Sequence, residues 1–236
     1  GEIKVDWNKF DPRLSLTNIT LFDAENRPAL QLNNTEVLVS WLSIPKLEPH
    51  LAELRILNPE LTIRRLKTGE IFVAGMSLKG ESKPELANWL IRQSKVKIKN
   101  AKIVWLDEMR DAPPLSLNDL DIELLSPPWK SLIKHHRLSI SAIPSVGTKT
   151  PITLLAELYG NDISRLEKWH GNANLHLRNA HIPDFKAWID DPLQISAASG
   201  NAQIYLTFAH QKIEVVNAQL ELAQLAFQPK PELPRI

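Results

Sequence analysis

The stretch Lys95-Val-Lys-Ile-Lys-Asn-Ala-Lys-Ile-Val-Trp105 contains the pattern that decides the fold. Apolar residues alternate with polar ones up to Ile98, Asn100 follows, and the alternation resumes at Ile103. Such alternation predicts a β-strand with one apolar and one polar face. Ile98 and Ile103 are five residues apart, so a straight strand would place them on opposite faces. A one-residue bulge at the asparagine would bring them to the same face and bend the strand.

This pattern of spaced apolar pairs around an Asn or Asp occurs seven times in the chain. A two-residue hairpin at Asn58-Pro59 would also bring the flanking apolar residues to one face. A hairpin is disfavoured there because proline fits badly at the second central position of the turn. It is also disfavoured in the repeats that have Asn-Ala at this place, such as Asn100-Ala101, because they lack the glycine of a tight hairpin. We therefore predict a mainly β protein with a few short helices, in which long bent antiparallel strands form a highly curved, groove-like sheet. The seven central residues are Asn18, Asn34, Asn58, Asn100, Asp119, Asn179 and Asn217.

Composition limits the classes of function. The net charge of the 236 residues is +1, which gives no electrostatic signal for nucleic acid, and the absence of cysteine excludes disulfides and thiolate metal sites. No apolar run approaches the ~20 residues of a transmembrane helix. The chain starts without methionine at a strand-like sequence, so we expect residues 1–236 to be a single β-rich segment of a longer protein. A sub-boundary is expected near 78–94, and residues 228–236 are expected to be a linker or cut end.

Strand-like sequence fills residues 13–66, 95–125, 137–158, 172–182 and 201–227, with a proline-punctuated connector at 41–50. The clearest helix is predicted near 83–93, where Ser82 and Glu85 have capping-box spacing and Pro84 lies in the first turn. Two shorter helices are predicted at 163–169 and 184–189. Short helices of this kind usually lie on the apolar face of a sheet or close one of its ends.

Candidate catalytic and metal-binding residues are few. Adjacent His135 and His136 would point to opposite faces of a strand, and His176 and His181 have no thiol or carboxylate at ligand spacing. Carboxylates cluster at 107–111 in a turn and at 119–123 on the polar side of a strand. No nucleophile elbow, phosphate loop or HExxH motif is present, so we predict neither an enzyme nor a cofactor. Lysines at 95–102 indicate a solvated strand face.

The apolar face of the strands is the main candidate site. In a closed β-sandwich this face would be the core, whereas in an open curled sheet it would line a trough. A lining dominated by leucine, isoleucine and valine suits acyl chains better than sugars, which prefer aromatic platforms. The candidate lipid-binding residues are Leu14, Leu16, Ile19, Leu21, Leu30, Leu32, Val37, Val39, Leu54, Ile56, Leu61, Ile63, Val96, Ile98, Ile103, Trp105, Leu115, Leu117, Leu120, Ile122, Leu175, Leu177, Ile204, Leu206, Ile213, Val215, Leu220 and Leu222.

A specific combination of residues occurs within 89–115: Trp89-Leu90, Gln93, Asn100-Ala101, Trp105, Asp107-Glu108, Arg110 and Ala112-Pro113-Pro114-Leu115. With these residues, the segment resembles the YhdP-type branch of the AsmA-like proteins of Gram-negative bacteria. The sequence around Asn58-Pro59 and the glycines at 69 and 75 fit the same family, and the resemblance extends over most of 13–190.

The resemblance implies a section of a longer periplasmic protein that an inner-membrane helix outside this chain anchors. It also implies a lipid-transport conduit, which carries phospholipid between inner and outer membrane along an apolar β-groove and supports the outer-membrane barrier. The implied partners are phospholipid acyl chains, both membranes through parts outside this chain, and other envelope proteins. Two alternatives are a closed β module that docks an envelope partner without lipid cargo, and, less favoured, a carbohydrate-active enzyme using Asp107–Asp111.

Overall fold

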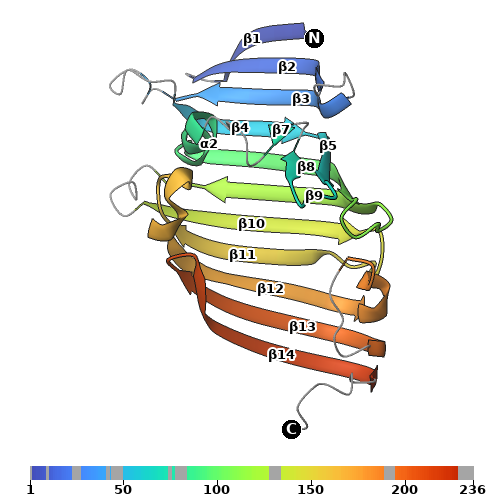
Figure 1. Cartoon of the computed structure of the whole chain (residues 1–236). Helices are drawn as coiled ribbons and strands as arrows, with labels where there is room; N and C mark the ends of the chain where they lie inside the picture. Colours follow the sequence, from blue (N-terminus) through green and yellow to red (C-terminus); the bar gives the residue numbers. More distant parts are fainter. Residues whose placement is uncertain are drawn as a thin grey trace.

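The computed structural model describes residues 2–8, 11–22, 28–40, 43, 50–73, 76–77, 84–127, 134–188 and 195–227. These residues form a single open, curled sheet of 14 strands, and Figure 1 shows the strands side by side in one layer with the two termini at opposite ends. The predicted fold class is confirmed. The strands are β1 (Glu2–Asn8), β2 (Asp11–Phe22), β3 (Pro28–Val39), β4 (Leu51–Leu57), β5 (Glu60–Arg65), β6 (Ile71–Val73), β7 (Met76–Ser77), β8 (Lys95–Asp107), β9 (Leu115–Leu125), β10 (His135–Pro144), β11 (Ile152–Tyr159), β12 (His170–His181), β13 (Ile195–Ala209) and β14 (Lys212–Phe227).

The sheet is mixed rather than purely antiparallel. Strand β8 runs parallel to β4 and to β5, and the other strand pairs are antiparallel. The prediction of antiparallel pairing is therefore wrong at this junction. The reason is the connection from β5 to β8, which contains β6, β7 and the helix α2 (Pro84–Ile91) and is long enough to return the chain to the same end of the sheet.

Five of the seven predicted bends have the backbone conformation of a bend. Positive φ angles occur at Asn18, Asn58, Asn100, Asp119 and Asn179, with values from 48° to 56°. Asparagine and aspartate tolerate this left-handed conformation better than other residues with a side chain. The hairpin alternative at Asn58-Pro59 is excluded, because β4 and β5 continue in one register along β8 on both sides of the bend.

Neighbouring strands hold some of these bends through side chains. The Asn100 N–H donates to Asp121 Oδ1 at 3.0 Å, and the Asn179 N–H donates to Asn201 Oδ1 at 3.0 Å. In both cases a residue of the next strand accepts the hydrogen bond that the bend removes from the ladder. The bends of adjacent strands are therefore coupled.

The bends predicted at Asn34 and Asn217 are wrong in their position or geometry. Neither residue has a positive φ, and β14 keeps one register with β13 from Val215 to beyond Asn217. The irregularity of β14 on the hairpin side lies at Glu214, next to the turn His210-Gln211, in which both residues have positive φ, and further irregularities occur near its other end, between Ala223 and Phe227. A two-residue turn of this type fixes the register from the start of the strand, so the break falls beside the turn.

The small core lies on the apolar face at the line of bends. Ala101 and Leu120 are each 3% exposed and Ala142 is 6% exposed, and Ile98 and Ile103 both pack against this cluster. The two isoleucines therefore share a face, as the bulge predicts. The buried apolar strand residues of the described ranges belong to this face, whereas Asn100 and Lys102 beside them are exposed. Because side chains converge on the inner side of a curved sheet, we infer from this difference in burial that the apolar face is the concave one.

The total surface agrees with an open layer. The accessible surface is 15425 Å², whereas a compact monomer of 26.7 kDa would expose about 10,700 Å².

The helices are short, as predicted. Helix α2 (Pro84–Ile91) confirms the predicted helix near 83–93, and two 3₁₀ helices, η2 (Ile163–Lys168) and η3 (Ile182–Phe185), occur near the two shorter predictions. Most of the 41–50 connector, Ile189 and residues 228–236 lie outside the described residues, so the predicted linker stays a prediction, as does the sub-boundary near 78–94. Among the helices that the structure describes, none combines the length and apolar character needed to cross a membrane.

Candidate functional site: an apolar trough

Two unbroken rows of side chains cross the concave face, one residue from each of eleven successive strands. The register of the paired strands places these residues opposite one another along the whole sheet. Ten strand spacings of about 4.8 Å give each row a length of about 48 Å. The first row is Val5, Leu14, Val37, Leu54, Val96, Leu124, Leu138, Ala156, Ala173, Leu206 and Val216, and the second is Leu16, Thr35, Ile56, Ile98, Ile122, Ile140, Leu154, Leu175, Ile204 and Ala218. On β1 the second row is continued by the backbone pairing of Ile3 with Leu16, which is all that the structure describes for Ile3.

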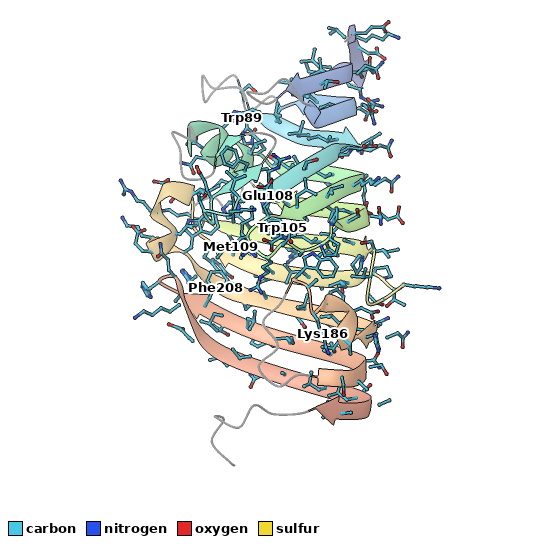
Figure 2. All side chains as sticks on the ribbon, turned by 45° about the vertical axis from the view of Figure 1, so that its right-hand side comes forward. Trp89, Trp105, Glu108, Met109, Lys186 and Phe208 are labelled. Atoms are coloured by element: carbon cyan, nitrogen blue, oxygen red, sulfur yellow. The ribbon has the colours of Figure 1, made fainter. Side chains whose placement is uncertain are left out.

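These rows run perpendicular to the strands and beside the line of bends. We infer that the strands curve towards the apolar face along this line of positive-φ residues, which gives the face the shape of a trough whose long axis follows the rows. Figure 2 shows the side chains standing on a single ribbon layer, with Trp105 on β8 and Phe208 at the end of β13. Among the described residues, no second sheet covers the apolar face.

Most of the predicted lining residues lie on this face. Beyond the bends, Leu61 and Ile63 of β5 pair with Ile103 and Trp105 of β8, and Trp105 pairs in turn with Leu115. Leu177 pairs with Ala202 and Ala180 pairs with Gly200. Gly200 and Ala202 are two residues apart on β13 and so share a face, which places Leu177 and Ala180 on one face as well. For Ile19, Leu21 and Leu30 the structure describes the backbone pairing only, in which Ile19 is opposite Leu32 and Leu21 is opposite Leu30.

Val215 does not lie on the concave face. It pairs with Thr207, whereas Leu206 and Phe208, the neighbours of Thr207, pair with Val216 and Ile213 on the concave side. The sequence pattern predicted that the alternation of faces along β14 is interrupted at Asn217, whereas it is interrupted at Glu214. This error placed Val215 on the wrong face. Ile213, Leu220 and Leu222 remain on the concave side.

The sequence analysis missed the contribution of β10 and β11. Leu138 and Ile140 on β10 and Leu154 and Ala156 on β11 occupy the middle of the two rows. These strands have no Asn-centred repeat, so they did not enter the candidate set. Their alternation between residues 137 and 158 was the available signal.

The opposite face of the sheet is polar and carries ion pairs between neighbouring strands. Lys97 Nζ lies 3.2 Å from Glu123 Oε2, and Lys99 Nζ lies 2.7 Å from Asp121 Oδ2. A further ion pair lies within one strand, where Arg55 Nη2 is 2.7 Å from Glu53 Oε1. The lysine row at 95–102 therefore belongs to a charge-balanced face, and the two faces of the sheet differ sharply in polarity.

One long rim of the trough, where β10 begins, carries a buried polar cluster. His136 shares the concave face with Leu138, and its two ring nitrogens lie 2.7 Å from Ser126 Oγ and from the Gly160 carbonyl oxygen. The Trp169 ring stacks on the imidazole at a centroid distance of 5.8 Å. A side chain at Gly160 would lie within 2.4 Å of the Trp169 ring, so this close approach requires glycine. Burial lowers the pKa of His136, which favours the neutral imidazole.

The opposite rim, where β5 and β8 end, carries an ion pair beside an aromatic ring. The Arg65 guanidinium donates two hydrogen bonds to the Asp107 carboxylate and lies 5.7 Å from the centre of the Trp105 ring. Asp107 is 3% exposed and also accepts from the Arg110 N–H at 3.2 Å. These contacts with Arg65, above all its hydrogen bonds, lower the pKa of Asp107.

This environment bears on the carboxylate cluster at 107–111. A general acid needs a raised pKa and access to substrate, whereas Asp107 is ionised and enclosed, and Glu108 lies 3.3 Å from Arg64 Nε. The cluster therefore has the features of structural ion pairs. Within the described ranges, no three His, Asp or Glu residues are arranged to hold a metal ion, and His135 and His136 point to opposite faces as predicted.

Comparison with known proteins gives one match. A family model described as YhdP protein matches residues 1–235. No curated protein and no solved structure matches the chain.

Proposed function

Because the chain belongs to the YhdP family, we propose that its trough carries phospholipid acyl chains through the periplasm between the inner and outer membranes. Family membership indicates a role in the cell envelope related to lipid transport. The choice of phospholipid as cargo is supported by the apolar surface of the trough, and support of the outer-membrane barrier as the outcome is an expectation from the family. The membrane contacts and an anchoring helix would belong to parts of the protein outside this chain.

The observation that carries the proposal is the continuity of the two apolar rows across eleven strands in an open layer. Exposing an acyl chain to water costs about 0.8 kcal/mol per methylene, so a two-chain phospholipid faces a cost on the order of 20 kcal/mol. An aliphatic trough removes most of this cost without any chemical step. Its length of about 48 Å exceeds the ~15 Å thickness of one leaflet's hydrocarbon.

The rows offer a similar apolar surface along the whole length of the trough. Their side chains are leucine, isoleucine, valine and alanine, with Thr35 as the polar exception, and they offer similar contacts at every strand along the row. A uniform apolar surface allows an acyl chain to shift from one strand to the next without a large change in free energy. Movement along the trough is therefore diffusive in this proposal.

Mass spectrometry of organic extracts from the purified chain tests the proposal. We expect bound phospholipid in the wild type and a loss of most of it in Ile204→Asp, which places a carboxylate in the second row. Gln203→Asp is the matched control, because Gln203 is the adjacent residue on the opposite face. Retained lipid in both variants, or no lipid in a folded wild type, would contradict the proposal.

The alternative is a module that docks an envelope protein and carries no lipid. The described residues form an open sheet and not a closed sandwich, so such a partner would cover the trough itself. A wild-type protein that is folded and lipid-free would favour this alternative.

A further inference from the structure

Strand β14 forms one edge of the sheet along its 16 residues and, among the described strands, pairs with β13 only (Figure 1). The free side of such a strand presents backbone N–H and C=O groups that can pair with a further strand. Proteins commonly protect an edge with charged residues, with proline or with a short strand. In β14 there is no proline, and no charged residue lies between Glu214 and Glu221.

The edge at the other end of the sheet is protected in this way. Strand β1 has 7 residues, and charged side chains occupy every second position at Glu2, Lys4 and Asp6. By contrast, β14 exposes large apolar side chains on the trough side, where Ile213 is 63% exposed and Val216 is 57% exposed. The β14 edge therefore has the features of an interface, whereas the β1 edge does not.

Two copies of β14 can pair antiparallel about a two-fold axis perpendicular to the sheet. Such an axis keeps the concave faces of both copies on one side, so each residue must lie opposite a residue of the same face. Strand β14 is regular from Val215 to Ala223, where it keeps one register with β13. A register centred on Asn217 meets the condition, and the residue that it leaves without an opposite is Glu214, at which the pairing with β13 also shifts.

The charged residues distinguish this register from the others that match the faces. Lys212 and Glu221 lie on the polar face, because their partners on β13, Ala209 and Asn201, belong to that face. When the axis passes through Asn217, Lys212 of each copy lies opposite Glu221 of the other, and a shift of one residue in either direction removes this pairing. The opposed pairs are Lys212 with Glu221, Ile213 with Leu220, Val215 with Gln219 and Val216 with Ala218, and Asn217 lies opposite the same residue of the second copy.

We propose that the free edge of β14 binds the same edge of a second copy of this chain, antiparallel and centred on Asn217. Opposed charges of this kind favour one register of a strand pair over its neighbours. The pairing also joins the two troughs, because Val216, at the end of the first row, meets Ala218, at the end of the second row of the other copy. What the joined trough carries rests on the proposed function, whereas the pairing itself does not.

A single pair of strands makes a small interface, so we expect a weak dimer that dissociates on dilution. Sedimentation equilibrium over a range of protein concentrations measures the dissociation constant. In dilute solution the chain is the single sheet, in which β14 is an open edge and Leu220 is exposed. Stability and hydrogen exchange of the single sheet are therefore measured in dilute solution.

The absence of native cysteine permits a test of the register. Opposed residues of an antiparallel pair have Cα atoms about 4.5–5.5 Å apart, which a disulfide can span, so Asn217→Cys should form a cross-linked dimer under mild oxidation. Gln219→Cys is the matched control, because its two copies lie on the same face but about 14 Å apart. A mixture of Gln219→Cys with Val215→Cys should cross-link again. Equal cross-linking of Asn217→Cys and Gln219→Cys would overturn the proposal.

A charge exchange tests the interface without cysteine. Lys212→Glu places two glutamates opposite one another, and symmetry does so twice in each dimer, so we expect the dissociation constant to rise about tenfold. Adding Glu221→Lys exchanges the two charges and should return the constant towards that of the wild type. Lys4→Glu on β1 is the control and should leave it unchanged.

Three results would overturn the proposal: a wild type that is monomeric at every concentration, no recovery in the double variant, or open-ended assemblies in place of dimers. A persistent monomer with slowly exchanging β14 amides would show that another part of the same chain occupies the edge. Open-ended assemblies would indicate that β14 binds β1 of the next copy, since such a contact does not close on itself.

Discussion

Asn100 shows how one residue type bends a strand of this sheet. Its φ of 52° lies in the left-handed region, where a side chain with a Cβ costs about 1–2 kcal/mol unless it is asparagine or aspartate. The backbone N–H of Asn100 donates a hydrogen bond to the Asp121 carboxylate, and this bond does not depend on the Asn100 side chain. The bend therefore depends on the conformational tolerance of asparagine more than on its amide contacts.

We expect Asn100→Ala to lower the free energy of unfolding by about 1 kcal/mol, and Asn100→Val to lower it further because a β-branched residue fits this region worse. Chemical denaturation of the purified chain measures the change. Asn217→Ala is the matched control, since Asn217 is also an exposed strand asparagine but has no positive φ. Equal losses at both positions would show that backbone conformation is not the cause.

Asp107 makes the stability of the chain dependent on acid. Its pKa is lowered in the folded protein by Arg65, so ionisation of Asp107 favours folding. This contribution is complete above the ordinary pKa of 3.8 and is lost as the pH falls through the lower pKa of the folded state. Asp107→Asn should therefore cost about 2 kcal/mol at pH 7.

Denaturation at a series of pH values checks this expectation. The stabilities of wild type and Asp107→Asn should converge as the pH is lowered from about 5 towards 2. Glu108→Gln is a suitable comparison because Glu108 pairs with Arg64 in a more exposed position, and an exposed pair contributes less than about 1 kcal/mol. A constant difference between wild type and Asp107→Asn at every pH would rule out the ion pair as its source.

At the scale of single elements, strands of similar sequence pattern differ in how deeply their apolar side chains are buried, and so in how much these side chains contribute to stability. Leu120 on β9 is 3% exposed and packs with Ala101 and Ala142, whereas Leu220 on β14 is 56% exposed. Strand β9 has a paired strand on each side, while β14 pairs with β13 only. The same apolar residue is therefore core in one strand and surface in the other.

Leu120→Ala should lower the free energy of unfolding by about 3 kcal/mol, within the range for truncation of a buried leucine. Leu220→Ala removes the same atoms from an exposed site and should cost less than about 1 kcal/mol. Denaturant titration of both variants gives the comparison directly. Similar costs would mean that β14 is covered in solution by something that buries Leu220.

At the scale of the whole molecule, the sheet is a linear array in which each strand is supported chiefly by its immediate neighbours. Extensive contacts link sequential strands such as β8 with β9 and β13 with β14. In such an array, stability approximates a sum of local terms, and the ends can open before the middle. The small cluster of buried residues lies near the middle, on β8, β9 and β10.

We therefore expect amide hydrogen exchange to be slowest in β8–β10 and progressively faster towards β14. Hydrogen-exchange mass spectrometry of the native chain measures this gradient. The amides of β9 and those of β13 and β14 are compared within the same sample, so each region serves as the reference for the other. Uniform protection across the sheet would indicate a single cooperative unit instead of a linear array.

The proposed role also belongs to this scale. A conduit needs a continuous apolar surface, and continuity depends on the register of eleven strands and not on any one residue. Ordinary aliphatic side chains are sufficient for such a role, because it requires no chemical step.

The sequence by itself determined the alternation of the strands, the bends at five Asn or Asp residues and the existence of one apolar face. These features are local: alternation assigns faces within a strand, and only a few residue types accept a positive φ. The sequence also indicated the helix at 83–93, through its capping residues. Each of these inferences used residues within about ten positions of one another.

The tertiary structure alone decided which strands are neighbours, and with them the parallel junction of β8 with β4 and β5. It moved the break of β14 to Glu214, because the hairpin turn sets the register there. It brought β10 and β11 into the trough and showed that the apolar face is an open layer instead of a sandwich core. These outcomes depend on contacts between distant segments, and alternation has the same period on an open sheet as on a closed one.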